Sequence, residues 1–272
     1  MDPVLEQIIA NIHPSDIKKT GMCYQKLSEL PIKQDGKLTY LAGRIAGVCQ
    51  TLQPDMLKKA VIIFAEGKQS KAEALEVAHG RAHINKVAHQ IGAGVMLLDM
   101  GLEQDIPESE GVQDLKVMHG SHFWANGAAM TEDEMLDAMF SGLQIGENLA
   151  DEGYQAVGLG NIGERSLLTA FIITAAFFKD ALHDLPAHMK SGDKLTHLTA
   201  LMNRLQLKDT QPLELLRRAG APDIAAMTGF ILAACQRNVM IVFDNAVTGA
   251  AVLIARALCP YVDDYVVPSA RY

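Results

Sequence analysis

The sequence predicts an α/β protein in which helices flank a parallel, Rossmann-like sheet. Short apolar runs recur along the chain, and segments with helical spacing of apolar residues separate them. Strands that alternate with helices are joined by right-handed crossovers, which build parallel sheets covered on both faces. No linker rich in Pro, Gly or Ser divides the 272 residues, so we expect a single domain over residues 1–272.

Five short apolar segments are expected to be the strands. The runs at 60–65 and 239–244 are continuous and rich in β-branched residues, as strands buried on both faces are. The run at 94–99 is similarly apolar. Shorter apolar runs at 155–158 and 265–267 complete the expected sheet.

The other periodic segments are expected to be helices. Thr131 and Glu134 have the spacing of a capping box, in which each side chain satisfies a first-turn amide. Pro14 ends the first helix because its ring cannot continue one. The expected helices cover residues 4–12, 37–52, 70–91, 131–152, 166–182, 194–205, 223–237 and 248–258. Residues 1–28 are expected to form a helical arm that packs on a partner subunit, because its apolar face has little chain beside it.

A glycine-rich motif follows the strand expected at 155–158. Residues 158–163 read GLGNIG and match G-x-G-x-x-G, in which glycines let backbone approach a phosphate at a helix N-terminus. The dinucleotide-binding motif also needs a second strand that ends in an acid. Asp180 has that spacing but lies in an expected helix. Two interpretations stay open: a phosphate-binding loop, or a turn closed by the helix-capping acid Glu164.

Composition excludes several classes of function. The net charge of -8 opposes binding to a nucleic-acid backbone, and no run of Lys or Arg forms a basic patch. No apolar stretch is long enough to cross a bilayer, and the first residues lack the pattern of a signal peptide. The four cysteines include no C-x-x-C pair. We therefore expect buried free thiols and a cytoplasmic location.

Asp244 and a pair of histidines have side chains that could carry chemistry. Asp244 ends an expected strand at the carboxyl edge of the sheet, where it either contacts a ligand or caps the next helix. His79 and His83 lie four residues apart, but no Cys or acidic residue stands at the usual metal-site spacing. We expect a solvated helix face there, and no bound metal.

Several segments, in order along the chain, resemble one known family. Residues 212–220 read PLELLRRAG and residues 223–229 read DIAAMTG, which resemble the PLEVLRRVGG and EIAALAG segments of the nicotinate-nucleotide:dimethylbenzimidazole phosphoribosyltransferases. Weaker similarities lie at 38–48, 60–65, 158–161 and 242–244. Members of this family transfer phosphoribose from nicotinate mononucleotide to a base that becomes the lower ligand of a cobamide. The resemblance implies no cofactor. It implies substrate contacts at four positions: Gly158, Gly160, Asn161 and Asp244.

The departures from the family are equally specific. After Ala65 the family has an Asp and a His, and this chain has Glu66-Gly67-Lys68 instead. An acid, two loop threonines and a helical lysine of the family are replaced by Ala156, Ile162, Gly163 and Leu198. The sequence ends at Tyr272, whereas members continue to a glutamate that acts as general base. Such a base contributes roughly 10²–10⁴-fold to proton removal, so we expect no catalytic residue in this chain.

The resemblance therefore implies a non-catalytic subunit. In a heterodimeric version of the family that activates phenol and p-cresol, one subunit catalyses and its partner does not. We expect this chain to be such a partner of a catalytic paralogue, with nicotinate mononucleotide and a phenolic or benzimidazole base as substrates of the complex. Neither nucleic acid nor membrane is an expected partner. The alternatives are a standalone phosphoribosyltransferase, an NAD(P)-dependent oxidoreductase that uses residues 158–163, and a binding protein without turnover.

Overall fold

A six-stranded parallel sheet forms the centre of the computed structural model, which describes residues 2–31, 36–53, 57–122, 127–163, 165–178, 199–207 and 209–269. The strands are β1 (Lys59–Gly67), β2 (Ala93–Leu102), β3 (Gln113–Asp114), β4 (Ala156–Ile162), β5 (Met240–Phe243) and β6 (Val266–Pro268). Every pairing in the sheet is parallel. The expected α/β fold class is therefore confirmed.

The strand order β3-β2-β1-β4-β5-β6 creates a switch point between β1 and β4. From β1 the chain winds outward to β3, and it then returns to add the other three strands on the opposite side. Lys59 pairs with Ala156 and Ala65 with Ile162, so the two central strands run side by side over the full length of β4. Doubly wound sheets of this order bind ligands at the carboxyl edge where the order reverses.

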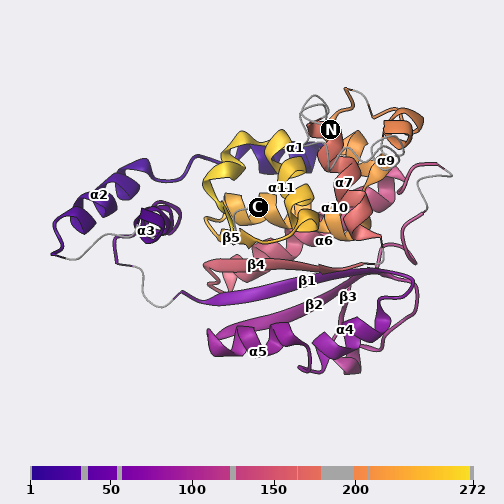
Figure 1. Ribbon diagram of the computed structural model, residues 1–272, viewed down its shortest axis with the longest axis horizontal. Helices are drawn as coiled ribbons and strands as arrows, with labels where there is room; N and C mark the ends of the chain where they lie inside the picture. Colours follow the sequence, from indigo (N-terminus) through magenta and orange to yellow (C-terminus); the bar gives the residue numbers. More distant parts are fainter. Residues whose placement is uncertain are drawn as a thin grey trace, which may run out of the picture.

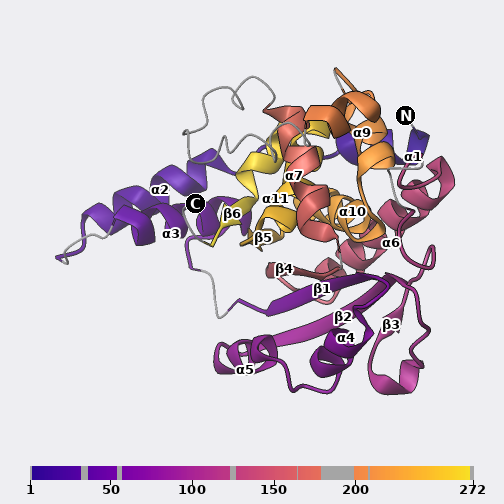
Figure 2. The same ribbon diagram turned by 45° about the vertical axis from the view of Figure 1, so that its right-hand side comes forward.

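Helices cover both faces of the sheet (Figures 1 and 2). One face carries α4 (Lys71–Ala78) and α5 (His83–Gln90). The other face carries a thicker layer that consists of α6 (Glu132–Asp151), α7 (Ser166–Phe177), α9 (Pro212–Ala219), α10 (Pro222–Gln236) and α11 (Ala246–Leu258). The capping box expected at Thr131 and Glu134 begins α6.

Helix α10 lies at the centre of the thicker layer, which explains why it is apolar on every side. Its Phe230 packs edge to face on Phe64 of β1, with ring centroids 6.2 Å apart. Glycines allow α6 and α10 to cross closely, because a Cβ added at Gly142 or Gly229 would overlap a backbone carbonyl of the facing helix. This contact holds α10 closely against α6.

The first helix, α1 (Pro3–Ala10), packs on α10 of its own chain. Leu5 and Ile12 are almost completely buried there. The expectation that the apolar face of the arm has little chain beside it is therefore wrong for residues 3–12. Sequence periodicity did not reveal this neighbour because α10 lies more than two hundred positions further along the chain.

The helices α2 (Ile17–Ser28) and α3 (Gly36–Val48) form a pair that projects from the body (Figure 1). Helix α2 lies within the helical arm expected at residues 1–28, and Asp16 caps it by accepting a 2.9 Å hydrogen bond from the amide of Lys19. Arg44 of α3 joins the pair to the body, because its Nη2 donates to the carbonyl oxygens of Asp263 and Val266 at 2.6 and 3.1 Å.

Other boundaries also differ from expectation. The helix expected at 70–91 is split into α4 and α5 by a turn in which Gly80 has a φ of 74°. The strand expected at 155–158 continues to Ile162. The helix expected at 166–182 is described to Phe177, and of the helix expected at 194–205 only residues 199–204 lie within the described part and are helical.

Two smaller expectations concern membranes and thiols. Among the residues that the structure describes, we find no helix that combines the length and the apolar character of a bilayer span. All four cysteines are free. Cys235 and Cys259 are buried as expected, whereas Cys23 and Cys49 are partly exposed.

Candidate functional site

Four chain segments meet at the carboxyl edge of the sheet, at the switch point. Strand β1 ends with Glu66 and Gly67, β4 ends at Ile162, α7 begins at Ser166 and α10 begins at Pro222. Two buried acids lie between these ends, since Glu66 is 2% exposed and Asp223 is 0% exposed. We call the group Glu66, Asn161, Gly163, Ser166 and Asp223 the switch-point crevice.

Asp223 accepts the hydrogen bonds that hold the crevice together. Its Oδ1 accepts a 2.8 Å bond from the amide of Ile224, and its Oδ2 accepts 3.4 Å bonds from Asn161 Nδ2 and Ser166 Oγ. Burial raises the pKa of Asp223 well above its ordinary value, and the charge of Glu66 raises it further. Burial therefore favours the neutral form of the Asp223 carboxyl.

Gly163 lies in the turn between β4 and α7, at the narrowest point of the crevice. A Cβ added there would overlap Ser166 Oγ and would lie 2.8 Å from Glu66 Oε1. Neither atom is the end of a long, freely moving side chain, so glycine is required for steric reasons. The same distances place the carboxylate of Glu66 directly against the turn that opens α7.

The mouth of the crevice holds a small cavity of about 10 Å³. Its lining residues are Glu66, Gly67, Lys68, Gly120, Ser121 and Arg165. A volume of this size holds about one water molecule. Lys68 Nζ lies 3.3 Å from Glu103 Oε1, in an ion pair. Basic side chains thus line the mouth, and the buried acids Glu66 and Asp223 lie behind it.

The glycine motif occupies a different place from the one expected. Gly158 and Gly160 lie inside β4, where they face Val61 and Ile63 of β1, so they form no loop. Strand residues alternate between faces, and Asn161 points to the α10 side, where it bonds to Asp223. Only Asn161 of the three expected contacts in this motif therefore reaches the crevice. The length of this strand was underestimated because glycine has a low strand propensity when each residue is judged alone.

Asp244 lies exposed at the carboxyl end of β5. It does not cap α11, because Asn245 is the capping residue and its Oδ1 accepts hydrogen bonds from the amides of Val247 and Thr248 at 2.9 and 3.0 Å. The helix-cap interpretation of Asp244 is therefore wrong. A ligand contact at Asp244 stays a prediction.

The turn from β4 to α7 contains candidate residues that the sequence analysis did not assign. Because β4 continues to Ile162, the residues at the turn are Gly163, Arg165 and Ser166, whereas Glu164 lies outside the described residues. Ser166 supplies a hydroxyl in a turn that was expected to have none. The turn could have been placed correctly from the sequence only if the full length of β4 had been known. The pairing of β4 with β1 and β5 establishes that length.

A third buried acid lies at the same edge, in β2. Asp99 Oδ1 accepts hydrogen bonds of 3.0 and 2.8 Å from the amides of Gly101 and Leu102, and its Oδ2 lies 3.4 Å from Lys116 Nζ. Burial raises the pKa of the Asp99 carboxyl. Lys116 also bonds to Asp105 at 2.7 Å, so this group holds the loop after β2 against the sheet.

The histidine pair is separated in the structure. His79 follows α4 and its Nε2 lies 2.6 Å from Glu110 Oε2, whereas His83 begins α5. Within the described ranges, no group of three or more His, Cys, Asp and Glu side chains is placed to hold a metal ion.

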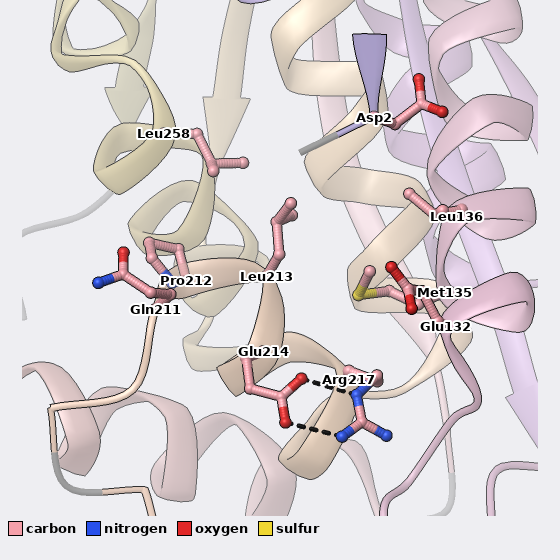
Figure 3. Close-up of a pocket in the computed structure, with 10 residues that line it drawn as sticks. All are labelled: Asp2, Glu132, Met135, Leu136, Gln211, Pro212, Leu213, Glu214, Arg217 and Leu258. Atoms are coloured by element: carbon pink, nitrogen blue, oxygen red, sulfur yellow. Dashed lines mark hydrogen bonds and ion pairs between the residues drawn. The ribbon is translucent and has the colours of Figure 1, made fainter. Parts of the chain in front are cut away.

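A larger cavity of about 550 Å³ lies among α6, α9 and the chain just before α1 (Figure 3). Leu213 and Met135 contribute apolar walls, and Glu214 binds Arg217 through two 2.7 Å hydrogen bonds. These bonds from Arg217, with smaller contributions from Arg218, lower the pKa of Glu214 to about 2. Arg218 Nη1 also donates to the carbonyl oxygen of Leu205 at 3.1 Å. The network braces α9 against its neighbours.

The fold defines a doubly wound α/β protein, and the crevice lies at its topological switch point, where proteins of this class bind ligands. A family model described as phosphoribosyltransferase matches residues 12–272. The chain belongs to the nicotinate-nucleotide:dimethylbenzimidazole phosphoribosyltransferase family. The expected resemblance to this family is thereby confirmed.

Individual relatives are similar over most of the chain. The nicotinate-nucleotide--dimethylbenzimidazole phosphoribosyltransferase of Geobacter metallireducens is 29% identical, with 97% of this chain and 80% of that protein covered. The corresponding protein of Chlorobium chlorochromatii is 28% identical, with 97% and 81% covered. A crystal structure of the enzyme from Thermus thermophilus superimposes with a TM-score of 0.76 at 23% identity, over 93% of this chain and 81% of that one. This last similarity supports the fold.

Proposed function

We propose that this chain is a subunit of a phosphoribosyltransferase that acts on nicotinate mononucleotide and a phenol or benzimidazole, and so activates the lower ligand of a cobamide. Its family membership and the names of its relatives support the reaction class. The strand order supports a ligand at the β1–β4 edge.

We further propose that this subunit is not catalytic. The observation that supports this proposal is that the polar groups of the crevice point inward. Ser166 Oγ and Asn161 Nδ2 donate hydrogen bonds to the buried carboxyl of Asp223. Among the described residues at the mouth, the cavity measures about 10 Å³, which is about the size of one water molecule. In this geometry the Ser166 hydroxyl proton and one amide proton of Asn161 are directed to Asp223, so they are not directed to a phosphate held in line for attack.

The proposed partner is a catalytic paralogue. A symmetric dimer interface presents the same surface from both subunits, so a duplicated gene can lose one of two sites and keep its ability to dimerise. Such a complex needs one intact crevice only. This chain would then contribute its surface, and the paralogue would contribute the chemistry.

The direct test is turnover by the pure chain. We expect no α-ribotide when the chain is incubated with nicotinate mononucleotide and either phenol or benzimidazole, because Asn161 and Ser166 are already bonded to Asp223. Chromatography of the products detects the ribotide. Measurable turnover by the pure chain would contradict the non-catalytic assignment.

Co-expression with a longer paralogue tests the partner. We expect a 1:1 complex on size exclusion that forms α-ribotide, with each chain alone as the control. Two separate homo-oligomers would count against the heterodimer.

One observation favours the standalone enzyme as a second candidate. Arg165 and Ser166 lie at the β4–α7 turn, where a phosphate would meet a helix N-terminus. If the chain is active alone, Ser166→Ala should lower kcat/KM by about tenfold or more, since a removed transition-state donor typically has a large effect.

The oxidoreductase alternative has lost its structural basis. It required residues 158–163 to form a phosphate loop, and residues 158–162 are strand. Thermal unfolding with and without NAD or NADP checks this directly, because a ligand that binds only the folded state raises Tm. We expect no shift with either dinucleotide.

A further inference from the structure

The larger cavity, of about 550 Å³, lies where three helices begin. Asp2 precedes α1 as its N-cap, Glu132 is the first residue of α6, and Gln211 precedes α9. All three residues line the cavity, and so does Leu258 at the end of α11. Among the described residues, this cavity and the switch-point crevice have no lining residue in common. The cavity is therefore a separate candidate site.

The helix ends and the acids around the cavity compensate one another. Each helix N-terminus carries a partial positive charge. Each also has an acid of the cavity lining beside it, which is Asp2 at α1, Glu132 at α6 and Glu214 at α9. Asp2 Oδ1 accepts hydrogen bonds of 2.8 and 3.3 Å from the amides of Val4 and Leu5. These ends therefore offer no strong attraction to an anion.

The acids are compensated by basic side chains as well. Glu214 binds Arg217 through two 2.7 Å hydrogen bonds, and it accepts a further bond of 2.5 Å from Arg218 Nε. The bonds to Glu214 raise the pKa of Arg217, and the charge of Glu132 raises it further. A cation that entered the cavity would compete with these guanidinium groups for the same carboxylates.

The middle of the cavity is apolar. In Figure 3 its apolar side chains lie between Asp2 and the Glu214–Arg217 pair. They are Met135, Leu136, Pro212, Leu213 and Leu258. The thioether of a methionine adapts to irregular shapes and makes favourable contacts with aromatic rings. The volume of this cavity lies within the range of roughly 300–1,000 Å³ that is typical of small-molecule sites.

We propose that this cavity binds a small neutral molecule with an aromatic body and one hydrogen-bond acceptor. The aromatic body gains free energy when it leaves water for the apolar wall. A charged molecule would lose hydration without an uncompensated partner to replace it. Arg217 bonds to Glu214 through Nε and Nη2, and within the described part of the chain its Nη1 has no bonded partner, so this group can donate to an uncharged ligand oxygen.

The experiment compares three ligands with the same apolar body: phenylbutanol, phenylbutylammonium and phenylbutyrate. The protein is prepared with isotope-labelled methionine methyl groups, and NMR follows the signal of Met135 in the wall of the cavity. Met139, one turn further along α6 and buried in the core, supplies the matched control signal. Met135→Leu and Met139→Leu assign the two signals.

We expect phenylbutanol to shift the Met135 signal saturably, with a Kd of about 1 mM or tighter, and to leave the Met139 signal in place. The two charged ligands should bind about fivefold or more weakly, because their end groups lose hydration. No saturable shift at Met135 would overturn the proposal. Equal or tighter binding of either charged ligand would overturn the assignment of a neutral ligand.

A pair of variants tests the apolar wall. Leu213→Ser, at a half-buried position of α9, should weaken binding of phenylbutanol about fivefold or more. Leu75→Ser, at a half-buried position of α4 on the opposite face of the sheet, is the matched control and should bind as wild type does. Equal weakening in both variants would contradict the proposal. If Leu213→Ser does not fold, the three ligands on the wild-type protein decide. The assay uses no substrate of the proposed reaction, so its outcome is independent of the turnover tests.

Discussion

Single residues determine how the crevice is ionised. Asp223 is fully buried and its pKa is raised by burial first and by Glu66 second. A carboxyl whose pKa is higher in the folded protein than in the unfolded chain stabilises the fold below the unfolded value of 3.8. This stabilisation is lost as pH rises from 3.8 towards the raised folded value, because the carboxyl ionises in the unfolded chain while the buried group keeps its proton.

Asp223→Asn tests this ionisation. Asn resembles the neutral carboxyl in shape. The unfolding free energy of the variant should therefore lack the decrease that the wild-type protein shows above about pH 4. As pH rises above about 4, the unfolding free energy of the variant should exceed that of wild type by an amount that grows by up to about 1.4 kcal/mol per pH unit. Urea unfolding at several pH values between the acidic and the mildly basic range measures it. The control is Asp137→Asn, at a position of α6 outside the crevice. Its unfolding free energy should change with pH in the same way as that of wild type.

At the scale of elements, helix contacts are controlled by glycines at the α6–α10 crossing. Gly229 has no room for a Cβ, because the carbonyl oxygen of Met139 lies in the way. Gly21 of α2 has no atom within 4 Å of an added Cβ. The two positions are both helical, but their surroundings are opposite. The same substitution should therefore have opposite effects on stability.

Gly229→Ala should destabilise the protein by about 3 kcal/mol, since an added methyl group in a closely packed core forces the helices apart. Gly21→Ala should stabilise it by about 0.5–1 kcal/mol, because alanine restricts the unfolded chain and favours helix. Denaturant unfolding of both variants gives the comparison. Similar values for the two would show that helix propensity, and not the crossing, governs both sites.

The fold was largely predictable from residue patterns, whereas the site was not. The capping box at Thr131 and Glu134 and the β-branched run of β1 are local signals, and local signals established α6 and the central strand. Glu66, Ser166 and Asp223 come together only through the pairing of β1 with β4 and the position of α10. Their separation along the chain hides this contact. Because β4 extends to Ile162, the turn begins only at Gly163, the last residue of the glycine motif.

For the molecule as a whole, the α2–α3 pair is the part that projects from the body. Arg44 makes two hydrogen bonds from this pair to backbone near the C-terminal strand, at Asp263 and Val266. Arg256 also bonds to Asp263, but through an exposed ion pair within the body. Loss of Arg44 should therefore loosen the projecting pair without affecting the core.

Arg44→Ala should speed amide hydrogen exchange in α2 and α3 by about tenfold or more, since loss of these bonds lowers the free energy of local opening. Exchange in α6 and α10 should stay at the wild-type rate. Mass spectrometry of peptic fragments resolves the two regions. Arg256→Ala is the control, and an equal effect from it would indicate that the pair opens only with the rest of the protein.

The position of β4 in the sheet has a consequence for synthesis of the chain. Strands β1, β2 and β3 leave the ribosome early and can pair with one another, but the second edge of β1 has no partner until Ile162 has emerged. This long apolar edge is open for the whole interval, and open edges of this kind pair with strands of other molecules. A nascent chain that stalls before β4 should consequently be the species most prone to aggregate, and most dependent on chaperones.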